Sequence, residues 1–335
     1  MTRLFGNPRI FVLMICLLIL AVLPYVATLL QQEFLYRVGT RIMIYAIAAV
    51  SLDLILGFGG MVSFGHAVFI GLGGYSIGIL SHYGITNGFL QFAVAIAGCA
   101  IFAGLTGAIC LRTGGLYFIM ITLAFSQMLY YLGIGLEEFG GDDGFRVENS
   151  VFFPGFSLGN RLILYYVTFV VLVGVLIGLS IMVNSRFGMV LRGSYSNERR
   201  MKAIGFPTYR YKLVAYILAG AICGVAGGLF VNLMNFMTPA YMHWEQSGDL
   251  LVMIIVGGVA TLFGGVVGSA VWVLSEIFMP ILIDIVWPGM GTNWKLVFGP
   301  LLILIVLYFK RGIFGSIPDR WKGGHAAAST SGGHH

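Results

Sequence analysis

The chain has 335 residues, of which 59% are hydrophobic and only 10% are charged. An average soluble domain is about 45–50% apolar and about 25% charged. With 19 basic and 13 acidic side chains, a water-soluble protein of this length could not cover its surface. The composition therefore predicts a polytopic membrane protein. It excludes a soluble enzyme, a nucleic-acid-binding protein and a disordered chain.

Apolar segments long enough to cross the bilayer follow one another along most of the chain. A transmembrane helix needs about 20 such residues. About ten segments are long enough, although some of them reach this length only if the loops between neighbouring segments are very short. They are 8–30, 42–58, 64–82, 90–111, 116–135, 162–183, 213–235, 249–263, 265–284 and 294–310. The expected fold is therefore all-α. Glycines within 57–75 and 257–268 predict broken or re-entrant segments at those two places.

The distribution of charge predicts the topology. Cytoplasmic loops of membrane proteins carry an excess of Lys and Arg. Alternating the segments from a cytoplasmic N-terminus leaves only five of the 19 basic residues outside and places the acidic loop 136–161 outside. We therefore expect both termini in the cytoplasm. Residues 1–322 would form the transmembrane domain, and the small, polar stretch 323–335 a disordered tail.

Polar side chains within these segments are candidates for a substrate path, because ionisable groups at membrane depth are costly and usually face a cavity or a partner. Asp53, His66 and Glu276 each fit either a substrate contact or a structural bond to a neighbouring helix, and no basic residue in the segments stands out as their partner. In 116–135, Thr122, Ser126 and Tyr130 form one stripe of a helix, which suits a neutral or zwitterionic solute or bonding between helices. The candidate path residues are Asp53, Ser63, His66, Tyr117, Thr122, Ser126 and Gln127.

Glycines recur at four-residue spacing, which lets helix backbones approach closely within one subunit or at a subunit interface. The pairs are Gly74/Gly78, Gly220/Gly224 and Gly264/Gly268. In addition, the two Gly-Gly pairs at 59–60 and 257–258 each follow an acidic residue, Asp53 or Asp249. Paired, glycine-interrupted segments of this kind are typical of transporters built from repeats.

The connection 184–212 is the longest cytoplasmic segment and holds seven of the 19 basic residues. Its pattern predicts one or two short amphipathic helices between Gly188 and Ile204, ended by Gly205 and Pro207. Such a segment could dock a cytoplasmic partner, or it could serve only to retain positive charge inside.

Six sequence stretches in a fixed order resemble the permease family of branched-chain amino acid ABC importers, the LivM-like branch. They are SLDLILGFGGMVSFGHAVFIGLGGY (51–75), LRTGGLYFIMITLAFSQ (111–127), GGDDG (140–144), SRFGMVLRGSYSNERRMKAIG (185–205), YKLVAYILAGAICGVAGGLF (211–230) and GDLLVMIIVGGVATLFGG (248–265). Two departures from the usual pattern are Asp53, where Asn is commoner, and the interruption of the basic helix at 193–195.

The resemblance implies a permease subunit that carries amino acids, branched-chain or otherwise hydrophobic, across the bacterial inner membrane. It implies three kinds of protein partner: a homologous, LivH-like permease, two cytoplasmic ATPases and a periplasmic solute-binding protein. The segment 185–205 would dock on the ATPase. The coupling residues expected within it are Arg192, Glu198, Arg199, Ala203 and Gly205.

The chain lacks the GxxxxGK[ST] phosphate-binding loop, so ATP and Mg²⁺ would be bound by the partner ATPases and the chain itself would not be an enzyme. An alternative is a proton-coupled secondary transporter of a small neutral or zwitterionic solute, in which Asp53 or Glu276 carries the proton. A membrane enzyme built on His66 and Ser63 is a further alternative, although only Asp53 is available as a third, orienting group.

Overall fold

The computed structural model describes residues 8–29, 32–286, 289, 291–308 and 312–315. Its long helices are α1 (Pro8–Leu29), α2 (Glu33–Asp53), α4 (Gly88–Cys110), α5 (Leu116–Gly135), α6 (Arg161–Asn184), α9 (Thr208–Met234) and α11 (Gly264–Val286). Shorter helices are α3 (Ala67–His82), α7 (Arg186–Ser196), α8 (Glu198–Ala203), α10 (Trp244–Gly257), α12 (Trp294–Tyr308) and α13 (Gly312–Gly315). The helical fold agrees with the sequence prediction. The predicted tail 323–335 lies outside the described residues.

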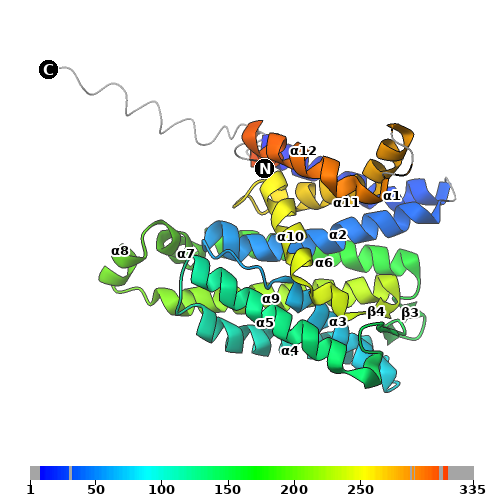
Figure 1. The fold of residues 1–335 in the computed structure, drawn as a ribbon, viewed down its shortest axis with the longest axis horizontal. Coiled ribbons are helices and arrows are strands. Elements are labelled where there is room, and N and C mark those ends of the chain that lie inside the picture. The colour runs from blue at the N-terminus through cyan, green and yellow to red at the C-terminus, as the bar shows by residue number, and fades with distance from the viewer. Residues whose placement is uncertain (1–7, 30–31, 287–288, 290, 309–311, 316–335) are drawn as a thin grey trace.

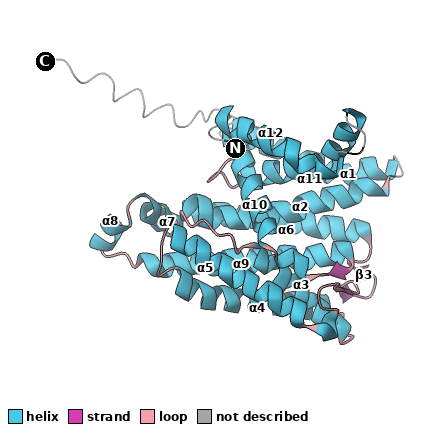
Figure 2. Cartoon of the chain, in the orientation of Figure 1, coloured by secondary structure: helices cyan, strands magenta, loops and turns pink. Residues whose placement is uncertain are grey.

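The helices form a bundle with two different ends. α7 and α8 lie at one end, and short strands lie at the opposite end (Figures 1 and 2). α1, α11 and α12 run along one side of the bundle, and α4 and α5 along the other (Figure 1). Side-chain caps fix several helix starts: Asn87, Asn160 and Ser185 accept hydrogen bonds from the first free amides of α4, α6 and α7.

Within the described part of the chain, six helices are long and apolar enough to cross a membrane. They are α4, α5, α6, α9, α11 and the continuous segment Glu33–Phe58 that contains α2. Two shorter apolar helices are Met14–Leu29 within α1 and the whole of α3, so the number of about ten spans stays a prediction. The second predicted span, 42–58, started too late, because α2 already begins at Glu33 and includes Arg41.

Two breaks interrupt the helices where glycines predicted them. α2 passes into a π-helical turn, η1 (Leu54–Phe58), and regular structure resumes only at α3. The second break, 258–263, separates α10 from α11. The two breaks meet: the buried Asp53 carboxylate accepts hydrogen bonds from the amides of Ala260 (2.8 Å) and Leu262 (3.0 Å). Both of these residues have positive φ, 60° and 52°, so Asp53 stabilises a strained turn.

The core lies where α9 packs against α2, α3 and α4. Here glycines allow backbones to touch: a Cβ at Gly73 would overlap the Gly224 carbonyl, and one at Gly227 would overlap the Ile70 carbonyl. The paired glycines of the sequence also face neighbours within the chain, for example Gly220 against Phe69. Of the two interpretations of this spacing, the structure supports close packing within the subunit.

The end opposite α7 and α8 carries a small cap that the sequence did not predict. β1 (Phe145–Arg146) pairs antiparallel with β4 (Phe236–Met237), and β2 (Val151–Phe153) pairs with β3 (Phe156–Ser157). Buried Ser150 joins the cap to the bundle. Its hydroxyl donates to the Gln91 carboxamide (2.5 Å), and its amide donates to Asn232 of α9 (2.8 Å). The loop that carries this cap exposes five acidic residues, Glu137, Glu138, Asp142, Asp143 and Glu148.

Candidate functional site

The connection between α6 and α9 folds into two short helices, as the sequence predicted. α7 and α8 project from one end of the bundle (Figure 1). The Asn197 side chain caps α8 by accepting a hydrogen bond from the Arg200 amide at 3.0 Å. α8 ends at Ala203, and Gly205 follows with a φ of +91°, a conformation that glycine adopts without strain.

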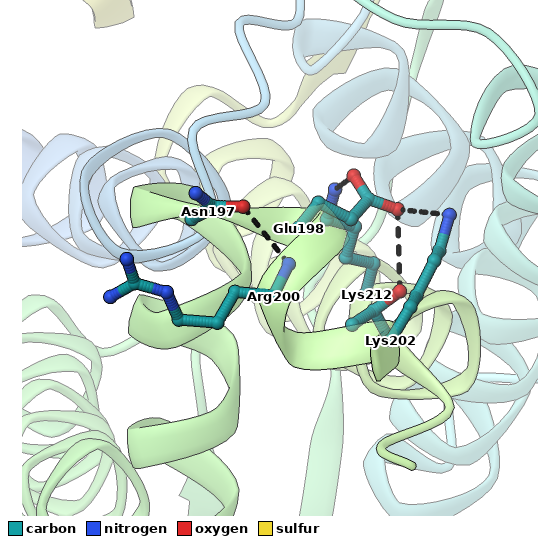
Figure 3. Close-up of polar contacts among 6 residues, drawn as sticks. Asn197, Glu198, Arg200, Lys202 and Lys212 are labelled. Atoms are coloured by element: carbon teal, nitrogen blue, oxygen red, sulfur yellow. Dashed lines mark hydrogen bonds and ion pairs between the residues drawn. The ribbon is translucent and has the colours of Figure 1, made fainter. Parts of the chain in front are cut away.

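Glu198 joins α8 to the first turn of α9. Its carboxylate pairs with Lys212 (2.6 Å) and Lys202 (2.9 Å) and accepts a hydrogen bond from Thr208 (3.2 Å). Figure 3 shows the carboxylate between the two lysines. Burial raises the pKa of Glu198, but hydrogen bonds and charge from Lys212 and Lys202 outweigh that effect and lower it from 4.5 to about 2. We call Glu198, Lys202, Thr208 and Lys212 the Glu198 clamp.

The other predicted coupling residues divide into two groups. Arg199, Ala203 and Gly205 are exposed and lie beside two exposed apolar side chains, Ile204 (63%) and Phe206 (39%). Arg192 instead donates to backbone carbonyls, to Val183 of α6 at 3.1 Å and to Gly188 at 3.3 Å. Whether these residues couple to an ATPase stays a prediction. The sequence could not separate those that face outward from Arg192, which holds the segment against α6.

α7 also contacts the break that follows α2. The Tyr195 ring packs so closely on Gly60 that a Cβ there would overlap it. Arg192 of α7 also contacts the end of α6, and Glu198 of α8 contacts the start of α9. These three contacts connect α7 and α8 to three parts of the bundle.

Three of the predicted path residues lie buried near the first break. Asp53 is fully buried against the 258–263 turn, and Ser63 accepts a hydrogen bond from the Gly65 amide at 3.3 Å. His66 Nε2 lies 2.9 Å from the Ser51 hydroxyl, and its ring packs edge-on against Phe69. Each is enclosed in this conformation, and whether substrate passes them stays a prediction.

α5 holds the remaining predicted path residues on two faces. Thr122 donates to its own helix at the Ile119 carbonyl (2.9 Å), and Ser126 donates to the Met242 carbonyl (2.9 Å) of η3 (Pro239–Met242). The buried stripe thus includes a bond between elements, one of the two roles the sequence left open. Tyr117 is 72% exposed and Gln127 is partly exposed, so these two lie on the open face of α5.

A charged pair that the sequence analysis missed joins α2 to α11. Arg41 Nη2 lies 2.8 Å and 2.9 Å from the two carboxylate oxygens of Glu276. The expectation that no basic residue in the spans partners these acids was therefore wrong for Glu276. Arg41 stands immediately before the predicted segment 42–58. An unpaired acid in an apolar helix was the evidence that could have pointed to it.

Among the residues described, no group of three or more His, Cys, Asp or Glu side chains is arranged to hold a metal ion.

Comparison with known proteins gives consistent matches. The family model described as "Branched-chain amino acid transport system / permease component" matches residues 34–307. The high-affinity branched-chain amino acid permease LivM of Salmonella typhimurium is 23% identical over 308 residues, covering 82% of this chain and 69% of the relative. LivM of Escherichia coli K12 is 24% identical over 303 residues, with the same coverage.

Further relatives belong to the LivH type. A probable LivH permease of Methanocaldococcus jannaschii is 33% identical over 159 residues, 45% of this chain and 47% of the relative. No solved structure matches the chain. The family match and the apolar helices indicate a multi-pass membrane protein. Because the match spans most of the chain, the protein belongs to the family of permease components of branched-chain amino acid transport systems.

Proposed function

We propose that the chain is the transmembrane permease subunit of an ABC importer that moves branched-chain or other hydrophobic amino acids across the bacterial inner membrane. The family match over 34–307 carries the proposal. The charge distribution supports an orientation with both termini and the α7–α8 end in the cytoplasm, because exposed basic residues gather at that end and acidic ones at the strand end.

The α7–α8 end is the proposed docking surface for the ATPases, which would bind ATP and Mg²⁺. Exposed apolar groups among charges are typical of a protein contact. Ile204 and Phe206 provide the apolar part, and the exposed basic residues Arg199, Arg200 and Lys202 precede them closely in the sequence. The Glu198 clamp would hold this surface rigidly on α9, so that ATPase movement tilts helices instead of only bending a loop.

The other partners are assigned by analogy with the relatives. LivH-type and LivM-type relatives support a second, homologous permease beside this one. A periplasmic solute-binding protein would approach the strand end. Tyr117 and Gln127, on the open face of α5, are the predicted path residues best placed to line a route for substrate. A proton-coupled secondary transporter is not favoured, because the matched relatives are named as components of amino acid transport systems.

Co-purification tests the proposal. The chain is expressed with the ATPase and permease proteins encoded beside it, and the complex is isolated in mild detergent. Ile204→Asp places a charge on the proposed surface. Phe153→Asp makes the same change at a comparably exposed position (60%) at the opposite end. We expect Ile204→Asp to weaken ATPase retention at least about tenfold, a loss of about 1.4 kcal/mol, and Phe153→Asp to retain it. Failure of the native chain to retain an ATPase would refute the proposal.

A further inference from the structure

The two breaks in the helices are joined by one side chain, close to α7. η1 (Leu54–Phe58) follows α2 and lies against α7, and the turn 258–263 separates α10 from α11. The Asp53 carboxylate uses both of its oxygens: Oδ1 accepts from the Ala260 amide at 2.8 Å, and Oδ2 accepts from the Leu262 amide at 3.0 Å. We call these two hydrogen bonds the Asp53 latch.

The turn and the carboxylate stabilise each other. Ala260 and Leu262 carry side chains, yet their φ angles are 60° and 52°, a region that is costly for any residue except glycine. Asp53 is fully buried, and a buried carboxylate is costly unless donors of this kind surround it. Breaking the latch would therefore free the turn to relax and would leave the carboxylate without these donors.

The segments on the two sides of the latch touch through glycine backbones and not through interlocked side chains. A Cβ at Gly57 would overlap the Ala260 amide nitrogen, and a Cβ at Gly312 of α13 would overlap the Gly258 Cα. Smooth contacts of this kind let two segments separate without unthreading side chains. A π-helical turn is also a place where helices bend, often at functional sites. The contact therefore resembles a hinge that one side chain holds closed.

The latch also adjoins the proposed docking surface. Tyr195 of α7 packs on Gly60, two residues after the end of η1. A movement of α7 would press on, or withdraw from, the segment that directly follows η1. The latch thus lies between the helices on which an ATPase would act and the two helices, α10 and α11, that the turn 258–263 connects.

We propose that the Asp53 latch holds a cytoplasmic gate of the permease closed, and that it is made in one nucleotide state of the docked ATPases and broken in the other. When it breaks, the turn 258–263 moves away from η1 and opens the cytoplasmic end of the bundle. Asp53 acts here as a positioning residue and does not contact the substrate. The inference rests on the proposed function and adds to it a named closing element.

The alternative is that Asp53 is a permanent fastener between α2 and the turn. Both roles predict that the protein is destabilised when Asp53 is lost, so stability alone does not separate them. Only a latch that opens during transport predicts that the amides of the turn change their protection with the nucleotide state.

The test measures amide hydrogen exchange of 258–263 in the purified complex of permeases and ATPases. It compares the nucleotide-free complex with the complex that has bound a non-hydrolysable ATP analogue and Mg²⁺. We expect exchange of the Ala260 and Leu262 amides to differ at least about tenfold between the two states, while the buried segment 226–231 of α9 changes little. Equal exchange of 258–263 in both states, with the analogue bound, would overturn the inference.

A variant examines the latch itself. Asp53→Asn keeps the size of the side chain, but only one oxygen remains to accept, and the new amide nitrogen would face an N–H donor. We expect exchange of 258–263 to be at least about tenfold faster in the state that makes the latch, so that the difference between the two states shrinks. Native nucleotide dependence in a folded Asp53→Asn complex would contradict the assignment.

Asp284→Asn is the matched control. Asp284 also accepts from a backbone amide, that of Gly291 at 2.7 Å, but it lies at the opposite end of α11. We expect this variant to leave the exchange of 258–263 unchanged, and the same acceleration as in Asp53→Asn would count against a specific latch. ATP-dependent leucine uptake by the native, complete importer tests the proposed function separately, so the two can fail independently.

Discussion

The Glu198 clamp predicts how firmly the α7–α8 end is held, and Glu198→Gln removes it while keeping the size of the side chain. The Lys212 pair is the main loss, because the Lys212 side chain is only 16% exposed and the distance is 2.6 Å. We assign it about 1–2 kcal/mol, between exposed pairs and buried charged hydrogen bonds. The Lys202 pair is an exposed i, i+4 contact and contributes about 0.3–0.5 kcal/mol. The sum is about 2 kcal/mol.

Amide hydrogen exchange of the complex measures this loss directly, because local opening exposes the amides of 200–206. A change of about 2 kcal/mol predicts exchange about 30-fold faster in Glu198→Gln, at 1.4 kcal/mol for each factor of ten. Lys202→Gln removes only the weak pair and should accelerate exchange about twofold. If the two variants exchange alike, Glu198 does not fasten α8 to α9 and the reasoning is refuted.

The clamp also has a defined pH dependence. Because the pKa of Glu198 is lowered from 4.5 to about 2 in the folded protein, the clamp contributes its full stabilisation above about pH 4.5. It loses that stabilisation as the pH falls toward 2. The difference in exchange between the native chain and Glu198→Gln should therefore shrink over that interval.

Three further predictions concern the membrane-embedded part. Asp53→Ala leaves two amides of the 258–263 turn without an acceptor, so we expect the protein to be destabilised by about 2–5 kcal/mol and to melt at a lower temperature in detergent. A variant that melts normally but no longer transports would instead favour a role for Asp53 in the substrate path. Gly227→Ala should destabilise the α3–α9 contact, whereas Gly174→Ala, where the structure leaves open space, should be neutral in the same melting assay. Gly205→Ala places a side chain at positive φ, costs about 1–2 kcal/mol, and should speed amide exchange around 205; unchanged exchange would contradict this.

The sequence predicted the elements whose cause is local. Continuous apolar stretches predicted the bounds of α4, α5 and α6 within a few residues, and Gly205 with Pro207 predicted the end of α8. The basic, amphipathic pattern predicted α7 and α8. The two glycine-rich breaks were also predicted, because glycine weakens a helix whatever it packs against.

Features that depend on distant partners could not be predicted in the same way. α2 extends back through Arg41 because the charge is compensated by Glu276, 235 positions away. Asp53 was a candidate for substrate contact by its place in an apolar segment, but its carboxylate is engaged by two amides of a turn formed 207 and 209 positions later. The strand cap depends on Ser150, Gln91 and Asn232, which no short motif connects.

The proposed function requires that ATP hydrolysed by partner subunits drives import through this chain. Uptake of labelled leucine by vesicles that contain the complete importer and its solute-binding protein tests it most directly. We expect uptake to require hydrolysable ATP on the side of the membrane where the ATPases are bound. It should persist when a protonophore collapses the proton gradient, and it should be absent when the chain is reconstituted alone. Uptake by the chain alone that stops with the protonophore and ignores ATP would contradict the account and point to a secondary transporter.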